Sequence, residues 1–415
     1  MTEAEKRRDA ADIFLQAVNE MLPDAAVKKA LSRGLPGNDI ILIGIGKASW
    51  TMAKAASEKL GARIRGGAII TKYGHSGGPI RGIEIYEAGH PLPDSETLRA
   101  TERILGITGS LEAGRMVLFL VSGGGSSLFE KPLPGLSLQS LTEITSALLL
   151  GGADISELNT VRKHLSSVKG GRFALHCMPA EIFQITLSDV LGDRLDMIAA
   201  GPAAPDPSTS EDALYVLKKY GTEVPEEILS APGSETPKSL NNVTYKMAGS
   251  IAGLCRAGKR SAENCGYLTD IVTERLEGEA EQAGRNVARY ALDEFVKYGP
   301  GFKRCLIWGG ETTVRVTGGG KGGRSQELAL AAAEQISGKK GIVILSAGSD
   351  GTDGPTDAAG GIVDGSTWEK IRAAGCDPMK MLKDNDSYTA LEAAGALFKP
   401  GPTGTNVNDL VIALA

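Results

Sequence analysis

Three glycine-rich segments follow short apolar runs, and each has features that could bind phosphate. They cover residues 122–127, 318–323 and 346–354. Backbone N–H groups that no Cβ shields can bind phosphate where a buried strand of an α/β protein ends. Lys321 and Arg324 add positive charge to the second segment. Together these features predict a site for a ligand that carries phosphate groups.

The segment 122–127 combines adjacent glycine amides with three hydroxyl groups. An anion could bind to these amides and to the start of the helix that follows. A tight β–α turn without a ligand is the alternative, but three adjacent glycines exceed what a turn requires. We therefore predict phosphate binding by six residues: Ser122, Gly123, Gly124, Gly125, Ser126 and Ser127.

Lys47 follows the apolar run 40–45, and its surroundings fit neither of two common nucleotide-binding motifs. A P-loop would need a glycine where Ile41 stands and a hydroxyl where Ala48 stands. A dinucleotide-binding turn would need a third glycine in place of Ser49 and an acid about 20 residues further on. A lysine at the carboxyl end of a strand suits a phosphoryl group in transfer, or it is a solvated lysine at a helix start.

Aspartates are concentrated after two further predicted strands. Asp189 follows the strand 181–187 and could orient a substrate hydroxyl as a base, bind Mg²⁺ or cap a helix. Asp350, Asp353 and Asp357 crowd one glycine-rich segment, where they either bind a metal or form turns. Oxygen ligands favour Mg²⁺ over Zn²⁺. We therefore predict a Mg²⁺ site with three candidate ligands: Asp189, Asp350 and Asp353.

Composition and motifs exclude several classes of protein. The four histidines have no metal-ligand spacing and G-x-S-x-G is absent, which disfavours a zinc enzyme and a Ser-His-Asp hydrolase. A net charge of −5 gives no reason to expect nucleic acid. No apolar run approaches the roughly 20 residues that a membrane-spanning helix needs, and the charged start lacks a secretory leader pattern. The five scattered cysteines are typical of reduced thiols in the cytoplasm.

The elements that would position these residues alternate along the chain. Apolar residues at helical spacing predict a first helix of about five turns. Short apolar runs then predict strands, and these alternate with helices, which indicates an α/β fold with mainly parallel sheets covered by helices on both faces. The predicted strands are 40–45, 67–71, 117–121 and 181–187, and the predicted helices are 48–60 and 138–150.

The length of 415 residues allows two domains. The alternation dissolves between residues 220 and 243, so we predict a Rossmann-like domain over 1–235 and a second α/β domain over 236–415. The last segment either stays with the second domain or packs back on the first. Ligands of open α/β sheets bind at the carboxyl ends of strands, so we predict the active site in the cleft between the domains. The second domain should contain strands 304–308, 312–316 and 341–345, and a solvated charged helix over 274–289.

Six longer runs of residues resemble the class II glycerate kinase family, whose C-terminal part is the MOFRL domain. They are 159–171, 188–193, 310–314, 322–327, 350–357 and 401–409, and together they span nearly the whole chain. Ser325 stands where the family often has asparagine. The likeness is long and specific enough to imply a fold and an activity.

The resemblance implies phosphorylation of D-glycerate by ATP between two Rossmann-like domains, with Mg²⁺ required. Catalytic roles would belong to Lys47, Asp189 and Arg324, which match the family's catalytic positions. Nucleotide or phosphate binding would extend to four residues of the C-terminal half: Glu311, Gly348, Asp350 and Asn406. We expect 2-phosphoglycerate as the product. The sequence leaves 3-phosphoglycerate open, and also the choice between a monomer and a homodimer.

Two other functions are compatible with the same architecture. A hydroxypyruvate reductase that uses NADH or NADPH would act on the same carbon skeleton, but the dinucleotide-binding turn is incomplete. A metabolite sensor without catalysis would need fewer aspartates beside its anion-binding loops. Both are therefore weaker hypotheses than the kinase.

Overall fold

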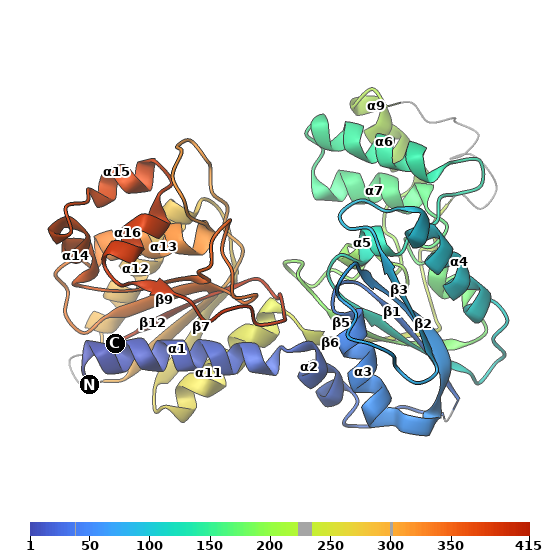
Figure 1. The fold of residues 1–415 in the computed structure, drawn as a ribbon, viewed down its shortest axis with the longest axis horizontal. Coiled ribbons are helices and arrows are strands. Elements are labelled where there is room, and N and C mark those ends of the chain that lie inside the picture. The colour runs from blue at the N-terminus through green and yellow to red at the C-terminus, as the bar shows by residue number, and fades with distance from the viewer. Residues whose placement is uncertain (38, 223–234, 299–301) are drawn as a thin grey trace. The chain divides into compact units, whose positions relative to one another are not determined.

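The computed structural model describes residues 1–37, 39–222, 235–298 and 302–415, and the chain forms two compact units (Figure 1). One unit is Pro23–Ala248, and the other combines Met1–Leu22 with Gly249–Ala415. This division differs from the predicted domains in two ways. The boundary lies between Ala248 and Gly249, at the last residue of β6, instead of at residue 235, and the first 22 residues belong with the C-terminal part.

The unit Pro23–Ala248 contains a six-stranded sheet in the order β3-β2-β1-β4-β5-β6. The pairs β3–β2, β2–β1, β1–β4 and β4–β5 are parallel. The strand order reverses between β1 and β4, which is where open α/β sheets bind ligands. The strands are β1 Ile40–Ile45, β2 Ile64–Lys72, β3 Ile83–Ala88, β4 Met116–Val121, β5 Glu181–Leu187 and β6 Val243–Gly249.

Both faces of this sheet are buried, which explains the continuous apolar runs of β1 and β4. Leu42 and Leu118 pack with α3 on one face, whereas Ile43 and Phe119 pack on the other. The predicted strand 40–45, helix 138–150 and strand 181–187 are confirmed. The helices of the unit are α2 Pro23–Ala30, α3 Ser49–Leu60, α4 Ser95–Thr108, α5 Gly125–Leu128, α6 Leu138–Leu150, α7 Ile155–Leu165, α8 Arg172–His176 and α9 Ser210–Lys219, with 3-10 turns Gly61–Arg63 and Ile198–Ala200.

The second unit contains a six-stranded sheet in the order β11-β10-β9-β12-β8-β7. The α/β class is confirmed, but this sheet is mixed: β7–β8 is parallel, and the four other pairs are antiparallel. Two of the antiparallel pairs arise because β12 enters between β8 and β9 in the opposite direction. The strands are β7 Leu268–Leu276, β8 Arg304–Gly310, β9 Val343–Gly348, β10 Gly360–Asp364, β11 Leu397–Phe398 and β12 Asp409–Leu414.

Two predicted elements of this unit are wrong. The expected strand 312–316 is reduced to an isolated bridge between Thr313 and Glu279. The expected helix 274–289 begins only at Ala280, because residues 274–276 complete β7. The last residues form β12 inside this sheet, so they belong to the second unit.

The N-terminal helix α1 (Glu3–Glu20) covers the second sheet. Figure 1 shows it in blue beside α11 and against β9 and β12. Its apolar face is buried, and the Phe14 ring meets the Phe398 ring edge-on with centroids 5.4 Å apart. Lys6 Nζ donates to the Gly341 carbonyl at 2.6 Å. The other helices are α11 Ile251–Asn264, α12 Ala280–Val296, α13 Arg324–Gln335, α14 Thr367–Ala373, α15 Pro378–Lys383 and α16 Ser387–Ala393.

Two further expectations can be compared with the described residues. None of their helices is long and apolar enough to cross a membrane. The five cysteines, which all lie in described ranges, form no disulfide.

Phe14→Ala tests whether α1 is a structural part of the second unit. Phe14 is fully buried, so we expect a loss of about 3–5 kcal/mol in the free energy of unfolding, as for other buried aromatic truncations. Urea denaturation followed by tryptophan fluorescence measures it. Leu150→Ala is the control, because Leu150 is 90% exposed and its truncation should change stability by less than about 0.5 kcal/mol. An equal, small effect of both changes would contradict the assignment of α1.

Candidate active site

Lys47, the first glycine-rich segment and Asp189 lie together at the carboxyl ends of β1, β4 and β5. The Lys47 amide donates to the Gly123 carbonyl at 2.9 Å, and the next amide donates to Ser122 Oγ at 3.1 Å. A Cβ placed on Gly123 would lie 2.3 Å from Asp189 Oδ2, so the carboxylate rests against that glycine. The structure thus brings the predicted catalytic pair Lys47 and Asp189 to one turn.

Gly123 and Gly124 leave an anion-binding surface open at this turn. Gly124 has φ of 83°, and a Cβ on it would lie 2.8 Å from His90 Cδ2 and 3.2 Å from Lys47 Cγ. Within the described ranges, neither glycine amide donates a hydrogen bond. Two adjacent unused N–H groups beside a lysine are a suitable site for a phosphate oxygen.

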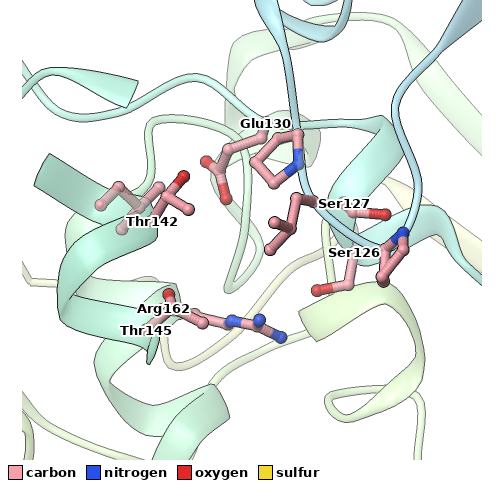
Figure 2. Close-up of a pocket in the computed structure, with 10 residues that line it drawn as sticks. Ser126, Ser127, Glu130, Thr142, Thr145 and Arg162 are labelled. Carbon is pink, nitrogen blue, oxygen red and sulfur yellow. The ribbon is translucent and has the colours of Figure 1, made fainter. Parts of the chain in front are cut away.

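The remaining residues of the segment 122–127 have different surroundings. Ser122 is buried, and its hydroxyl accepts the Ala48 amide, so it shapes the turn. The Gly125 amide donates to the Ser122 carbonyl at 3.3 Å. Ser126 and Ser127 line a neighbouring pocket (Figure 2). The predicted phosphate binding is therefore best supported for the two central glycines.

His90 is a site residue that sequence reasoning missed. It follows β3, and its ring lies against Gly124. Burial lowers the pKa of His90, and the nearby charges of Lys47, Lys72 and His75 lower it further. The imidazole is therefore neutral near pH 7. No sequence pattern indicates this position, because its proximity to Lys47 depends on the order of the strands.

Arg324 lies in a separate cluster, in the C-terminal unit. Asp409 begins β12 and pairs in register with Gly310 of β8 and Gly348 of β9. Its carboxylate accepts two hydrogen bonds from Arg324, at 2.5 and 3.1 Å. Glu311 forms an ion pair with the same guanidinium at 2.8 Å. Arg324 is therefore held by two carboxylates.

Burial raises the pKa of the Asp409 carboxyl to about 6, against the opposing effect of the Arg324 hydrogen bonds. The negative charges of Asp353 and Glu311 also raise it. Sequence reasoning did not select Asp409, although the run 401–409 that contains it was recognised. The antiparallel position of β12 gives this residue its place between two strand ends.

The two predicted metal ligands of this unit differ in availability. Asp353 accepts hydrogen bonds from the Ser325 amide at 3.2 Å, the Gln326 amide at 2.8 Å and Gln326 Nε2 at 3.0 Å. It therefore caps α13. In the described part of the chain, the Asp350 carboxylate accepts one hydrogen bond, from the Thr352 amide at 3.0 Å, and Asp350 is partly exposed.

A closed metal cage does not form in the described parts of the chain, where no three His, Cys, Asp or Glu side chains are arranged so that they could hold a metal ion. Mg²⁺ is commonly bound by one or two carboxylates together with substrate phosphates. Asp350 fits such an open site, and Asp189 at the glycine turn of the other unit supplies a carboxylate of the same kind. Asp353 fits less well, because its oxygens already accept amide hydrogen bonds.

In the glycine-rich segment 318–323, the amides of residues 318–321 already donate hydrogen bonds within the fold, which makes them less suitable for a phosphate than we expected. The amides of Thr317 and Gly318 donate to Asn385 Oδ1 at 2.8 and 3.0 Å. Those of Gly319 and Lys321 donate to the carboxylates of Asp384 and Asp386, both at 3.1 Å. The glycines therefore allow this segment to pack closely against residues 384–387.

Two other predicted binding residues are also engaged in the fold. The Gly348 amide donates to the Ala359 carbonyl at 2.9 Å. Asn406 is exposed, and its side-chain oxygen accepts the Asn408 amide at 3.3 Å. Asn408 itself donates to Glu311 Oε2 at 3.0 Å, so it joins the Arg324 cluster in place of Asn406.

Comparison with known proteins gives matches over nearly the whole chain. A family model described as "Domain of unknown function (DUF4147)" matches residues 9–231, and the MOFRL family matches residues 304–409. The D-glycerate 2-kinase of Thermotoga maritima is 54% identical over 98% of this chain and 97% of its own. The glycerate 2-kinase of Pyrococcus horikoshii is 43% identical over 90% of this chain and 87% of its own.

A solved structure and one further relative complete the comparison. The crystal structure of a glycerate kinase from Thermotoga maritima matches with a TM-score of 0.95 and 53% identity, and covers 99% of both chains. A relative from Agrobacterium vitis is 39% identical over 96% of this chain and 92% of its own, and has the provisional name hydroxypyruvate reductase.

Asp409→Asn tests the electrostatics of the Arg324 cluster. The pKa of Asp409 is raised from 3.8 to about 6 by folding, so its protonation stabilises the folded state fully below about pH 3.8. That contribution is lost as the pH rises through about 6. We expect the stability difference, wild type minus variant, to fall by about 1–3 kcal/mol over this window.

Urea denaturation between pH 4 and 7.5 measures this difference. Asp24→Asn serves as the control, because Asp24 is a half-exposed carboxylate in an ion pair at 3.9 Å with Lys28. A stability difference between the wild type and Asp409→Asn that is independent of pH would show that Asp409 does not titrate in this range.

Proposed function

Because the chain belongs to the glycerate kinase family that joins a DUF4147 region to a MOFRL domain, we propose that it transfers the terminal phosphoryl group of ATP to the 2-hydroxyl of D-glycerate. The observation that carries the proposal is the turn where Lys47 and Asp189 meet the unused amides of Gly123 and Gly124. Two close relatives are named 2-kinases, which supports the 2-hydroxyl of glycerate as the acceptor instead of the 3-hydroxyl.

Phosphoryl transfer needs positioning of the reactants and neutralisation of negative charge more than covalent chemistry by the protein. The amides of Gly123 and Gly124 bind phosphate oxygens of ATP. Lys47 places its ammonium group beside the same turn and stabilises the phosphoryl group as it moves. Asp189 orients the attacking hydroxyl and accepts its proton.

His90 fits this scheme as a neutral hydrogen-bonding group beside Gly124. A second positive charge there would compete with Lys47, so the lowered pKa of His90 keeps the positive charge on the lysine. Arg324 contributes a guanidinium whose direction is set by Asp409 and Glu311, and it stabilises negative charge on the phosphates.

Mg²⁺ would be bound by Asp350 or by Asp189, and would neutralise the charge of the ATP phosphates. Asp353 keeps a structural role at the start of α13. The five unpaired cysteines suit a reducing compartment, and we place the enzyme in the cytoplasm.

The proposed reaction can be measured directly. Purified protein with ATP, Mg²⁺ and D-glycerate should release ADP, and phosphorus NMR should show 2-phosphoglycerate. A product spectrum of 3-phosphoglycerate would show that the 3-hydroxyl is the acceptor.

The name of the Agrobacterium vitis relative makes the reductase a second candidate. It is tested by the loss of NADH absorbance with hydroxypyruvate, and we expect none. NADH consumption without ADP release would overturn the kinase.

Lys47→Ala and Asp189→Asn test the roles at the glycine turn. Each change removes a group that acts in the transition state, so kcat should fall by about 100-fold or more. Steady-state ADP release measures kcat. Lys54→Ala is the control, because Lys54 lies on the exposed side of α3 and should leave kcat unchanged. Near wild-type turnover of either variant would remove that residue from the mechanism.

A further inference from the structure

A pocket of about 330 Å³ of empty space, open to solvent, lies beside the glycine turn of the N-terminal unit (Figure 2). Its walls come from the segment after β3, from α5 and from the helices α6 and α7. The polar lining consists of Ser126, Ser127, Glu130, Thr142, Thr145 and Arg162, and the apolar lining of Pro91, Leu92, Pro93 and Leu141. A small organic anion would find both kinds of surface here.

Arg162 gives this pocket its positive charge. It lies on α7, and Figure 2 shows its guanidinium pointing toward Ser126. In the described ranges, no carboxylate forms an ion pair with it and no residue accepts its hydrogen bonds. Burial lowers the pKa of Arg162, and the nearby charge of Glu130 opposes this effect. A guanidinium is nevertheless always protonated in proteins, so Arg162 keeps its positive charge and favours the binding of an anion.

Glu130 does not neutralise Arg162, because other groups already occupy it. Lys169 Nζ lies 3.1 Å from its carboxylate, and the Ser166 hydroxyl donates to it. Lys169 is fully buried and also donates to the carbonyls of Ser126 and Phe129, at 2.8 and 2.7 Å. The pair of Lys169 and Glu130 is therefore neutral in itself, and Arg162 leaves one uncompensated positive charge.

Ser126 supplies an unused hydrogen-bonding group next to this charge. Its hydroxyl is buried and has no partner within the described structure. Buried hydroxyls without a partner are uncommon and costly, which suggests that a ligand completes this one. Ser127 is different, since its hydroxyl donates to the Gly124 carbonyl at 3.2 Å and stabilises the turn.

The contrast with Arg324 decides which arginine is available for a substrate carboxylate. Arg324 is paired with Asp409 and Glu311, whereas no carboxylate among the described residues pairs with Arg162. A planar guanidinium can bind both oxygens of a carboxylate at once. In D-glycerate the 2-hydroxyl is on the carbon next to the carboxylate. A carboxylate bound at Ser126 would thus bring that hydroxyl toward the turn where Gly124 meets Lys47.

We propose that Arg162, together with the Ser126 hydroxyl, binds the carboxylate of the hydroxy-acid substrate and makes the enzyme select acids over polyols. The inference rests on the proposed kinase function and adds a binding residue to it. Arg162 recognises the ground state and the transition state equally, so its loss acts mainly on the KM for glycerate.

Arg162→Met tests this assignment, because methionine keeps much of the length of the side chain and removes its charge. We expect the KM for D-glycerate to rise by about 10- to 100-fold, the usual scale for a lost hydrogen bond to a charged group, with the KM for ATP unchanged within twofold. The KM of Arg162→Lys for D-glycerate should lie between the values of the wild type and of Arg162→Met, since lysine keeps the charge but loses the bidentate geometry. The preference for glycerate over glycerol should decrease in the same order.

Ser126→Ala is a second variant with little risk to folding, and it should raise the KM for glycerate several-fold. Arg99→Met is the matched control, because Arg99 lies exposed on α4, paired with Glu96, and should change neither KM. A raised KM for ATP alone would assign the pocket to phosphate and overturn the proposal. Unchanged KM values in both Arg162 variants would also overturn it, whatever their thermal stability. A wild-type protein that forms no phosphoglycerate would instead refute the kinase function.

Discussion

The N-terminal site depends on one constraint: its polar side chains lie in close contact with the backbone of two glycine residues. Asp189 rests against Gly123, and Lys47 and His90 rest against Gly124, at distances that a Cβ atom would prevent. The left-handed φ of Gly124 adds a second reason for glycine there. These contacts leave two amides open between a cation and a carboxylate. The chemistry of the site thus depends on the absence of a Cβ atom at Gly123 and Gly124.

The C-terminal unit reaches a similar concentration of charge by another route. There the strand β12 runs opposite to its neighbours and places Asp409 where β8 and β9 end. Arg324 then lies between Asp409 and Glu311, and burial keeps the pKa of Asp409 high. The mixed sheet is what allows a residue from the end of the chain to join groups that follow two other strands.

Charge compensation separates the cations of the fold from those available to a ligand. Lys163 is buried against Asp206 at 2.6 Å, and Lys169 against Glu130 at 3.1 Å. A buried charge without a partner is costly, so such pairs are needed for the fold to tolerate these lysines. Arg162 differs, because it faces a pocket and forms an ion pair with no carboxylate of the described ranges. This difference, and not sequence position, marks it as a binding residue.

The sequence by itself determined the α/β class, most strands of the first sheet and the closeness of Lys47, Asp189 and the 122–127 turn. Apolar runs of six or seven residues identify buried strands, and groups that follow neighbouring parallel strands must meet at one edge. The activity could also be predicted from the sequence, because the matching motifs extend over nearly the whole chain. Local pattern and strand direction were sufficient for these conclusions.

Only the tertiary structure decided the use of the other glycines and the partners of the charges. Residues 318–323 resemble a phosphate loop in the sequence, yet the amides of residues 318–321 donate to residues 384–386, about 65 positions further on. The inclusion of α1 in the second unit and the roles of Asp409, His90 and Arg162 also depend on contacts between distant segments. A sequence shows which groups can donate or carry charge. The packing of distant elements determines which of them are already paired and which remain free for a substrate.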